Sequence, residues 1–153
     1  MTVPFGKHKG TPVELLLLKE PDYVYWLFQQ HDESASLLRL KEKARSLFKK
    51  FDQKPFRLRK CMGGHCSALA TGITFYESNL APYWWCDNCN VKQSGAVPGK
   101  LRRISSYSQA LSHVKMECDG RRDSFKALIT TMAQAKGLPP RAGKLQAAKF
   151  FLT

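Results

Sequence analysis

The sequence predicts an α+β fold: an N-terminal helical module, central zinc-ribbon β-hairpins and C-terminal helices. The middle of the chain carries two close pairs of cysteines among β-rich runs, whereas the two flanks carry apolar residues at spacings of three and four. These observations divide the chain into a helical module over 1–53, a zinc ribbon over 54–103, and basic helices over 104–153 that pack on the rest.

Two short helices are predicted near the N-terminus. Pro12 suits a first helical position and Thr11 suits the N-cap before it. Pro21 and Asp22 end that helix and begin a second one. The second helix carries an apolar face formed by Tyr23, Trp26 and Leu27.

Stronger helical patterns follow on both flanks. The segment 32–51, capped by Asp32 or Ser34, has an apolar stripe at helical period. In the C-terminal third, one helix carries a shorter stripe, and Asp123 or Ser124 suits the cap of another, which stops at Gly137. The three stripes are Leu37, Leu40, Ala44, Leu47, Phe48 and Phe51; then Tyr107, Leu111 and Val114; then Phe125, Leu128, Ile129 and Met132.

Three β-rich runs are predicted in the middle of the chain. Residues Phe56–Arg59 alternate apolar and basic side chains, as in a half-buried strand. Ile73–Tyr76 and Tyr83–Trp85 are rich in β-branched and aromatic residues, and the nineteen residues between Cys66 and Cys86 suffice for a hairpin. We therefore expect a strand to lead into each cysteine pair.

The cysteine pairs predict a structural zinc ion held by Cys61, Cys66, Cys86 and Cys89. Paired cysteines a few residues apart let one turn point two thiolates at a metal, and four protein ligands leave no coordination position for a substrate. His65 is an alternative to Cys66 as the ligand of the first pair. Two further candidates, Cys118 and His113, are interpreted as a buried helix thiol and a surface imidazole.

The charge of the chain favours a polyanionic partner. Lys and Arg number 25 against 12 Asp and Glu, for a formal net charge of +13. Such an excess repels itself in a compact fold and attracts nucleic acid, DNA or RNA. The predicted contact residues are Lys7, His8 and Lys9 in a glycine-flanked turn, the cations Arg57, Arg59, Lys60, Arg102 and Arg103, and the aromatic residues Tyr83 and Trp84, which would stack on bases.

Membrane and secreted locations are not expected. The longest apolar run, Leu15–Leu18, is far shorter than the roughly 20 residues that a transmembrane helix needs. The first ten residues lack the apolar core of a signal peptide. We therefore expect an intracellular protein, in the cytoplasm or nucleus.

Two other functions stay open. A metal-dependent His-Asn-His-like nuclease would use His65 or His113 with Asn88 or Asn90. A protein–protein adaptor would present Trp84 and Trp85 on the hairpin to a partner. The distribution of the basic residues in the fold distinguishes these functions, because a nucleic-acid-binding protein gathers them on one face.

A short N-terminal pattern resembles a known module. Residues Phe5–Pro12 read FGKHKGTP, and residues Asp22–Leu27 read DYVYWL. This combination resembles the C-terminal domain of exodeoxyribonuclease X-type proteins, also called the quorum-sensing-regulated virulence factor family, over about the first 30 residues. The resemblance implies an accessory role beside a nuclease or another nucleic-acid-processing protein. The exonuclease catalytic domain has no counterpart here, and the helix between Pro12 and Pro21 is richer in leucine than the family pattern.

Overall fold

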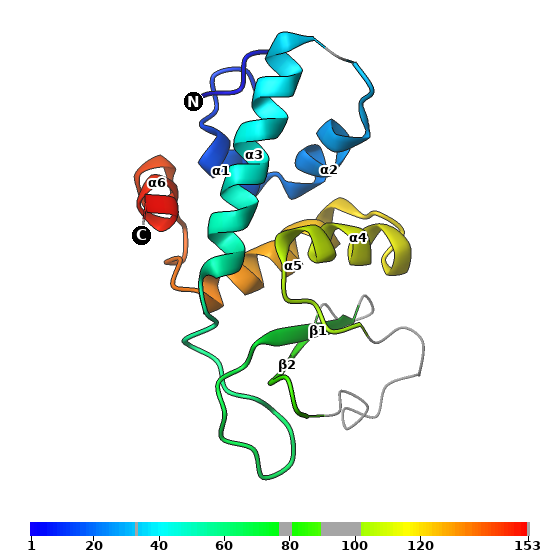
Figure 1. Cartoon of the computed structure of the whole chain (residues 1–153), viewed down its shortest axis with the longest axis vertical. Coiled ribbons are helices and arrows are strands. Elements are labelled where there is room, and N and C mark those ends of the chain that lie inside the picture. Colours follow the sequence, from blue (N-terminus) through cyan, green and yellow to red (C-terminus); the bar gives the residue numbers. More distant parts are fainter. Residues whose placement is uncertain (33, 77–80, 90–101, 153) are drawn as a thin grey trace.

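The computed structural model describes residues 1–32, 34–76, 81–89 and 102–152, and its fold is α+β, as predicted (Figure 1). Helices flank a two-stranded antiparallel sheet. The elements in chain order are α1 (Val13–Lys19), α2 (Pro21–Gln29), α3 (Ala35–Gln53), β1 (Gly72–Tyr76), β2 (Ala81–Trp85), α4 (Tyr107–Glu117), α5 (Arg122–Ala135) and α6 (Lys144–Leu152).

The helices share one hydrophobic core to which both flanks of the sequence contribute. Helix α1 is short, yet it contacts α2, α3, α5 and α6, and its residues Leu16 and Leu17 are fully buried. The predicted stripes of α3, α4 and α5 are all buried in this core. Trp26 of α2, predicted to share an apolar face with Tyr23 and Leu27, is not buried with them. It is 48% exposed and stacks on the Tyr23 ring.

The helix starts agree only in part with the predicted caps. Ser34 caps α3, because its hydroxyl accepts a hydrogen bond from the Leu37 N–H at 3.3 Å. Helix α1 begins one residue later than predicted, after Pro12 instead of Thr11. Helix α5 begins at Arg122, so Asp123 lies inside its first turn, where its charge complements the helix dipole.

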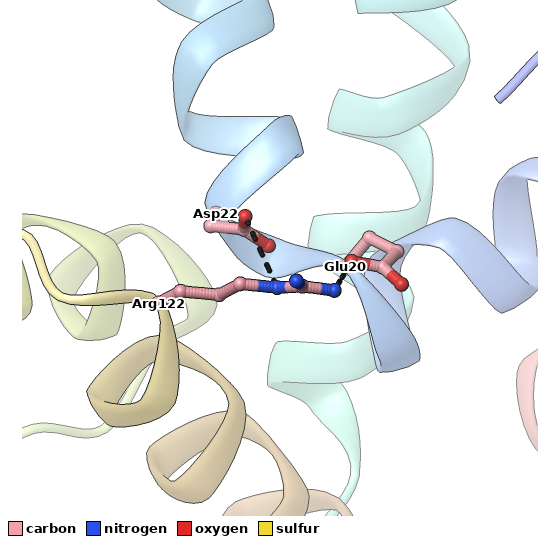
Figure 2. Close-up of polar contacts among 3 residues, drawn as sticks. All are labelled: Glu20, Asp22 and Arg122. Atoms are coloured by element: carbon pink, nitrogen blue, oxygen red, sulfur yellow. Dashed lines mark hydrogen bonds and ion pairs between the residues drawn. The ribbon is translucent and has the colours of Figure 1, made fainter. Parts of the chain in front are cut away.

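A surface ion-pair cluster joins the start of α5 to the junction of α1 and α2. Figure 2 shows the guanidinium of Arg122 between two carboxylates, with Nη2 3.2 Å from Glu20 Oε2 and Nε 3.8 Å from Asp22 Oδ2. The Arg122 side chain is largely exposed, so each pair contributes little to stability. The ion pairs lie at the edge of the region where α5 packs against α1 and α2.

The hairpin separates two environments. Strands β1 and β2 pair antiparallel with Gly72 opposite Trp85 and Ile73 opposite Trp84. Because paired residues share a face, Ile73, Phe75 and Trp84 lie together, and all three belong to the helical core. Trp85 lies on the other face, in a small separate cluster with Cys61 and Cys86, and its indole N–H donates to Thr74 Oγ1 at 2.9 Å.

The predicted strand over Phe56–Arg59 is wrong. These residues form a turn after α3, and only Lys60 makes an isolated β-bridge, to Leu69. The turn is held in place by α5, because the Leu58 N–H donates to the Ala135 carbonyl at 3.3 Å. Phe56 is buried, so its apolar character reflects packing in the core and not strand alternation.

A second isolated bridge brings the chain back to the sheet after the hairpin. Ile73 and Ile104 exchange two backbone hydrogen bonds, of 2.9 and 2.8 Å. This bridge places Arg102 and Arg103 beside β1.

Within the ranges that the structure describes, none of the helices is long and apolar enough to cross a membrane.

Candidate metal centre

Four cysteine sulfurs converge at the end of the hairpin. The Sγ atoms of Cys61, Cys66, Cys86 and Cys89 all lie within 4.8 Å of one another. Cys66 Sγ and Cys86 Sγ are 3.8 Å apart, so these are free thiols and not disulfides. The cluster can therefore hold a metal ion with one sulfur from each residue, as the sequence predicts.

The first ligand loop is tied to both the hairpin and itself. Cys61 donates its N–H to the Ala68 carbonyl at 2.8 Å, and Met62 donates to the Trp84 carbonyl at 2.7 Å. The Gly63 N–H donates to Cys61 Sγ at 3.3 Å. These bonds curl the loop so that both of its cysteines face β2.

Gly63 is the position at which the loop depends on glycine. A Cβ at this position would lie 2.6 Å from Cys89 Sγ and 3.4 Å from Cys61 Sγ. Any larger residue would therefore displace the Cys89 side chain. The sequence predicts that glycines let this loop curl, but the close approach of the two loops at Gly63 follows only from the fold.

His65 lies in the loop without joining the cluster. Its side chain is exposed, and its backbone adopts a left-handed conformation with φ of 59°. The residue that joins the other three cysteines is Cys66. Of the two alternatives for this ligand, the geometry favours the thiol.

The second ligand loop follows β2 directly and places its two thiols in different electrostatic surroundings. The N–H of Asn88 points at the Cys86 sulfur and, with hydrogen bonds from Cys89, lowers the pKa of the Cys86 thiol to about 6. Hydrogen bonding to Cys86, Cys61 and Cys66 raises the pKa of Cys89 to about 12. One thiolate thus forms readily, whereas further thiolates accumulate negative charge that a cation would balance.

Arg103 braces the second ligand loop. Its Nη2 donates to the Cys89 carbonyl at 2.6 Å, and its Nη1 donates to the Asp87 carbonyl at 3.4 Å. The side chain crosses β1 at Gly72, where a Cβ would lie 2.5 Å from Arg103 Cγ. Asp87 is held from the other side by the Thr71 hydroxyl, which donates to Oδ1 at 2.6 Å. Arg103, predicted as a nucleic-acid contact, therefore has a positioning role beside the cysteines.

The two spare candidates for metal binding belong to the helical core. Cys118 is fully buried at the end of α4, as interpreted from the sequence. The interpretation of His113 as a surface imidazole is wrong, because His113 is only 2% exposed. It packs under β1, with Nε2 3.2 Å from the Phe75 carbonyl, and burial lowers its pKa.

Two of the predicted contact residues of the N-terminal turn, Lys7 and His8, approach the Tyr23 ring of α2. The His8 ring meets the Tyr23 ring edge-on at a centroid distance of 4.5 Å, and Lys7 Nζ lies 5.9 Å from the Tyr23 ring centroid. Lys7 and Lys9 are exposed. This turn therefore belongs to the helical region and not to the hairpin.

The aromatic residues proposed for base stacking have different positions. Trp84 is only 4% exposed and packs between Phe56, at 5.2 Å, and the guanidinium of Arg59, at 5.8 Å from its centroid. Tyr83 is partly buried beside the cysteines. Because Trp84 and Trp85 are both buried, neither presents the exposed indole that a protein–protein adaptor would use.

The predicted basic residues do not all meet. Arg102 and Arg103 line a pocket with His113 on the α4 side of β1. Arg57 instead lines pockets with Lys54 and Lys136 near the end of α3. Lys60 is exposed at the bridge that precedes Cys61. Asn88 is exposed in the second ligand loop, whereas Asn90 lies outside the described residues.

No protein-family model, curated protein or solved structure matches the chain. The resemblance of Phe5–Leu27 to the exodeoxyribonuclease X-type module therefore stays a prediction.

Proposed function

We propose that the chain is a zinc-containing basic nucleic-acid-binding protein that acts as an accessory module in DNA or RNA processing. The observation that carries the proposal is the cluster of four cysteine sulfurs on a two-stranded hairpin, in a chain of net charge +13. The cluster supports the zinc part of the proposal, and the charge supports the nucleic-acid part.

Zinc fits the donor set and its spacing. Zinc prefers thiolates at about 2.3 Å in a tetrahedron, whose sulfur–sulfur edge is then about 3.8 Å. The 3.8 Å between Cys66 Sγ and Cys86 Sγ agrees with this edge. All sulfur–sulfur distances in the cluster are within 4.8 Å, so the four thiols need to move only slightly closer together to reach tetrahedral spacing. With Cys61 and Cys89 as the remaining ligands, zinc would cross-link the two loops and fix the end of the hairpin.

The charge distribution supports binding through phosphates. The acidic residues are fewer than half as many as the basic ones, and several basic residues lie on or beside the hairpin. Affinity from such residues comes from neutralised phosphates and released counterions, so it falls steeply with added salt. The N-terminal resemblance supports a nuclease or another nucleic-acid-processing protein as the partner.

The test is binding of the purified, zinc-assayed protein to labelled single- and double-stranded DNA and RNA. Each polymer is measured at two salt concentrations, with and without magnesium. We expect binding that weakens at the higher salt and no cleavage. Absence of binding at low salt would refute the nucleic-acid proposal, and magnesium-dependent cleavage would replace it with the His-Asn-His-like nuclease.

A further inference from the structure

The C-terminal ends of α3 and α5 meet beside α6 (Figure 1). Two adjoining open pockets lie in this region. Their volumes are about 270 and 430 Å³, and both are lined by Lys54, Arg57 and Lys136. Lys149 lines the first pocket and Lys50 the second. We call these five residues and the space between them the basic pocket.

The described lining of the basic pocket is rich in cations and contains no acidic residue. Among the described residues that line it, five carry positive charge and none is Asp or Glu. The remaining walls include Pro55, Pro139 and Phe150. Apolar walls lower the local dielectric and concentrate the field of the surrounding cations. The ligand that such a pocket favours is an anion.

Arg57 is held at the pocket by backbone features of α5. The neighbouring Leu58 N–H is bonded to the Ala135 carbonyl at 3.3 Å. The Arg57 guanidinium packs on Gly137, where a Cβ would collide with it and where φ is +110°. Glycine thus serves two purposes here: it allows the left-handed turn after α5, and it makes room for the arginine.

Lys136 provides a fixed positive charge at the base of the pocket. Its side chain is 4% exposed, and Nζ donates to the Phe51 carbonyl at 2.9 Å and to the Lys54 carbonyl at 2.5 Å. Nζ also lies 4.4 Å from the centroid of the Phe56 ring. Lys136 therefore satisfies the carbonyls at the end of α3, and Arg57, Lys149 and Lys50 lie exposed at the rim of the pocket.

The cations of the pocket oppose one another. Burial, and then Lys54, lower the pKa of Lys136 to about 8, although the Asp52 carboxylate acts in the other direction. Burial and Arg57 lower the pKa of Lys54. Asp52 is itself engaged, because Oδ1 accepts the Tyr107 N–H at 2.8 Å. An anion between Lys54 and Arg57 would relieve this repulsion.

From this arrangement we infer that the basic pocket is a phosphate-binding site, with Arg57, Lys149 and Lys50 as the groups that contact the phosphates. The inference rests on the proposed function for one part only, namely that the phosphates belong to a nucleic-acid backbone. Sequence reasoning named Arg57 as a contact residue but did not place it beside Lys136 and Lys149, because the fold brings these two residues to it from 79 and 92 positions further along the chain.

The experiment compares two double variants that remove the same charge. Arg57→Gln/Lys149→Gln changes the rim of the pocket. Arg39→Gln/Lys144→Gln changes two basic residues that are exposed on α3 and α6 but do not line it. Both variants lower the net charge by two, so non-specific attraction falls equally. The probes are inorganic tripolyphosphate and a labelled oligonucleotide. The oligonucleotide is of the polymer that wild type binds best, or is single-stranded DNA if wild type binds none of the polymers.

We expect the pocket variant to bind both probes about tenfold more weakly than wild type. For the oligonucleotide, the slope of log K against log salt concentration should become smaller in magnitude by about one to two. The control variant should lose less than about twofold in affinity for either probe. Equal losses in the two variants, or no loss in either, would overturn the inference and leave the proposed function standing. Binding of tripolyphosphate alone, lost in the pocket variant, would support the site and refute its nucleic-acid ligand. Failure of wild type to bind either probe would overturn both.

The melting temperature and zinc content of each variant are measured alongside. Both rim side chains are exposed, so we expect neither quantity to change. If the double variant does not fold, Lys149→Gln is compared alone with Lys144→Gln on the same helix, with the same criteria.

Discussion

The helical region and the cysteine face of the hairpin differ in how much apolar surface they bury. The helices bury a continuous core to which α1 to α6 all contribute. On the cysteine face of the hairpin, the buried hydrophobic cluster consists of Cys61, Trp85 and Cys86, with partly buried neighbours. A two-stranded hairpin is marginal in water by itself. The helices and the core-facing side of the hairpin therefore depend on apolar burial, whereas we expect the two cysteine loops to depend on a metal ion held by the four thiols.

The largest expected effect is loss of the metal. Structural zinc in small domains contributes about 10–16 kcal/mol of binding free energy, which becomes folding free energy. We expect Cys86→Ala to release zinc and to abolish amide-exchange protection in β1 and β2, while the helical circular dichroism persists. Cys118→Ala is the matched control, since this thiol lies in the helical core. Unchanged zinc content and melting temperature in Cys86→Ala would show that the cysteines hold no metal.

The next effect concerns the helical region. Leu40 of α3 is fully buried, so Leu40→Ala should lower the free energy of unfolding by about 2–5 kcal/mol. Leu38, on the same helix, is 50% exposed, so Leu38→Ala should change the free energy of unfolding by less than about 0.5 kcal/mol. Urea denaturation measures both, with zinc release followed in the same titration. Release of zinc at the same urea concentration as helix unfolding would show that the two regions unfold as one unit.

A smaller effect is expected at the contact between Arg103 and the second ligand loop. Arg103→Gln removes the donors to the Asp87 and Cys89 carbonyls, and loss of such outer contacts typically weakens metal binding by about tenfold. Arg102→Gln is the control, because Arg102 instead contacts Met116 Sδ, at 3.5 Å. Zinc affinity is measured by competition with a chromogenic chelator. Equal affinity in the two variants would argue against a bracing role for Arg103.

The smallest effect is the pH dependence that Lys136 gives to the helical region. Its folded pKa is lowered to about 8 from 10.5, so above pH 8 the unfolded chain binds more protons than the folded chain. Stability then rises with pH between about 8 and 10.5 relative to a protein without this group. We expect the free energy of unfolding of wild type, minus that of Lys136→Met, to grow across this window in urea titrations. A difference that stays constant or falls would contradict the lowered pKa.

Local sequence patterns predicted the parts of the molecule that depend on neighbouring residues. The stripe of α3 and its Ser34 cap are set within a few residues, and so are the short spacings of the cysteine pairs. The hairpin of β1 and β2 followed from their β-rich composition and from the distance between Cys66 and Cys86. In each of these cases the interaction that decides the structure lies within one element or between adjacent ones.

The predictions that failed depend on tertiary packing. Alternation in Phe56–Arg59 suggests a strand, but α5 captures the segment as a turn through Ala135 and Gly137. His113 has the polarity of a surface residue, yet the Phe75 carbonyl gives it a partner under β1. The complete basic pocket is not visible as a local sequence pattern, because Lys136 and Lys149 come from positions far from Lys50, Lys54 and Arg57.

The opposite orientation of two adjacent tryptophans has a spectroscopic consequence. Trp84 faces the helical core, and Trp85 faces the cysteine cluster. Their indole emission therefore reports on different environments, although a single peptide bond separates them. With Trp26 and one member of the pair replaced by phenylalanine, the remaining fluorophore would follow either side of the sheet alone. The chain thus contains its own pair of optical probes for watching metal loading and helix packing separately in time.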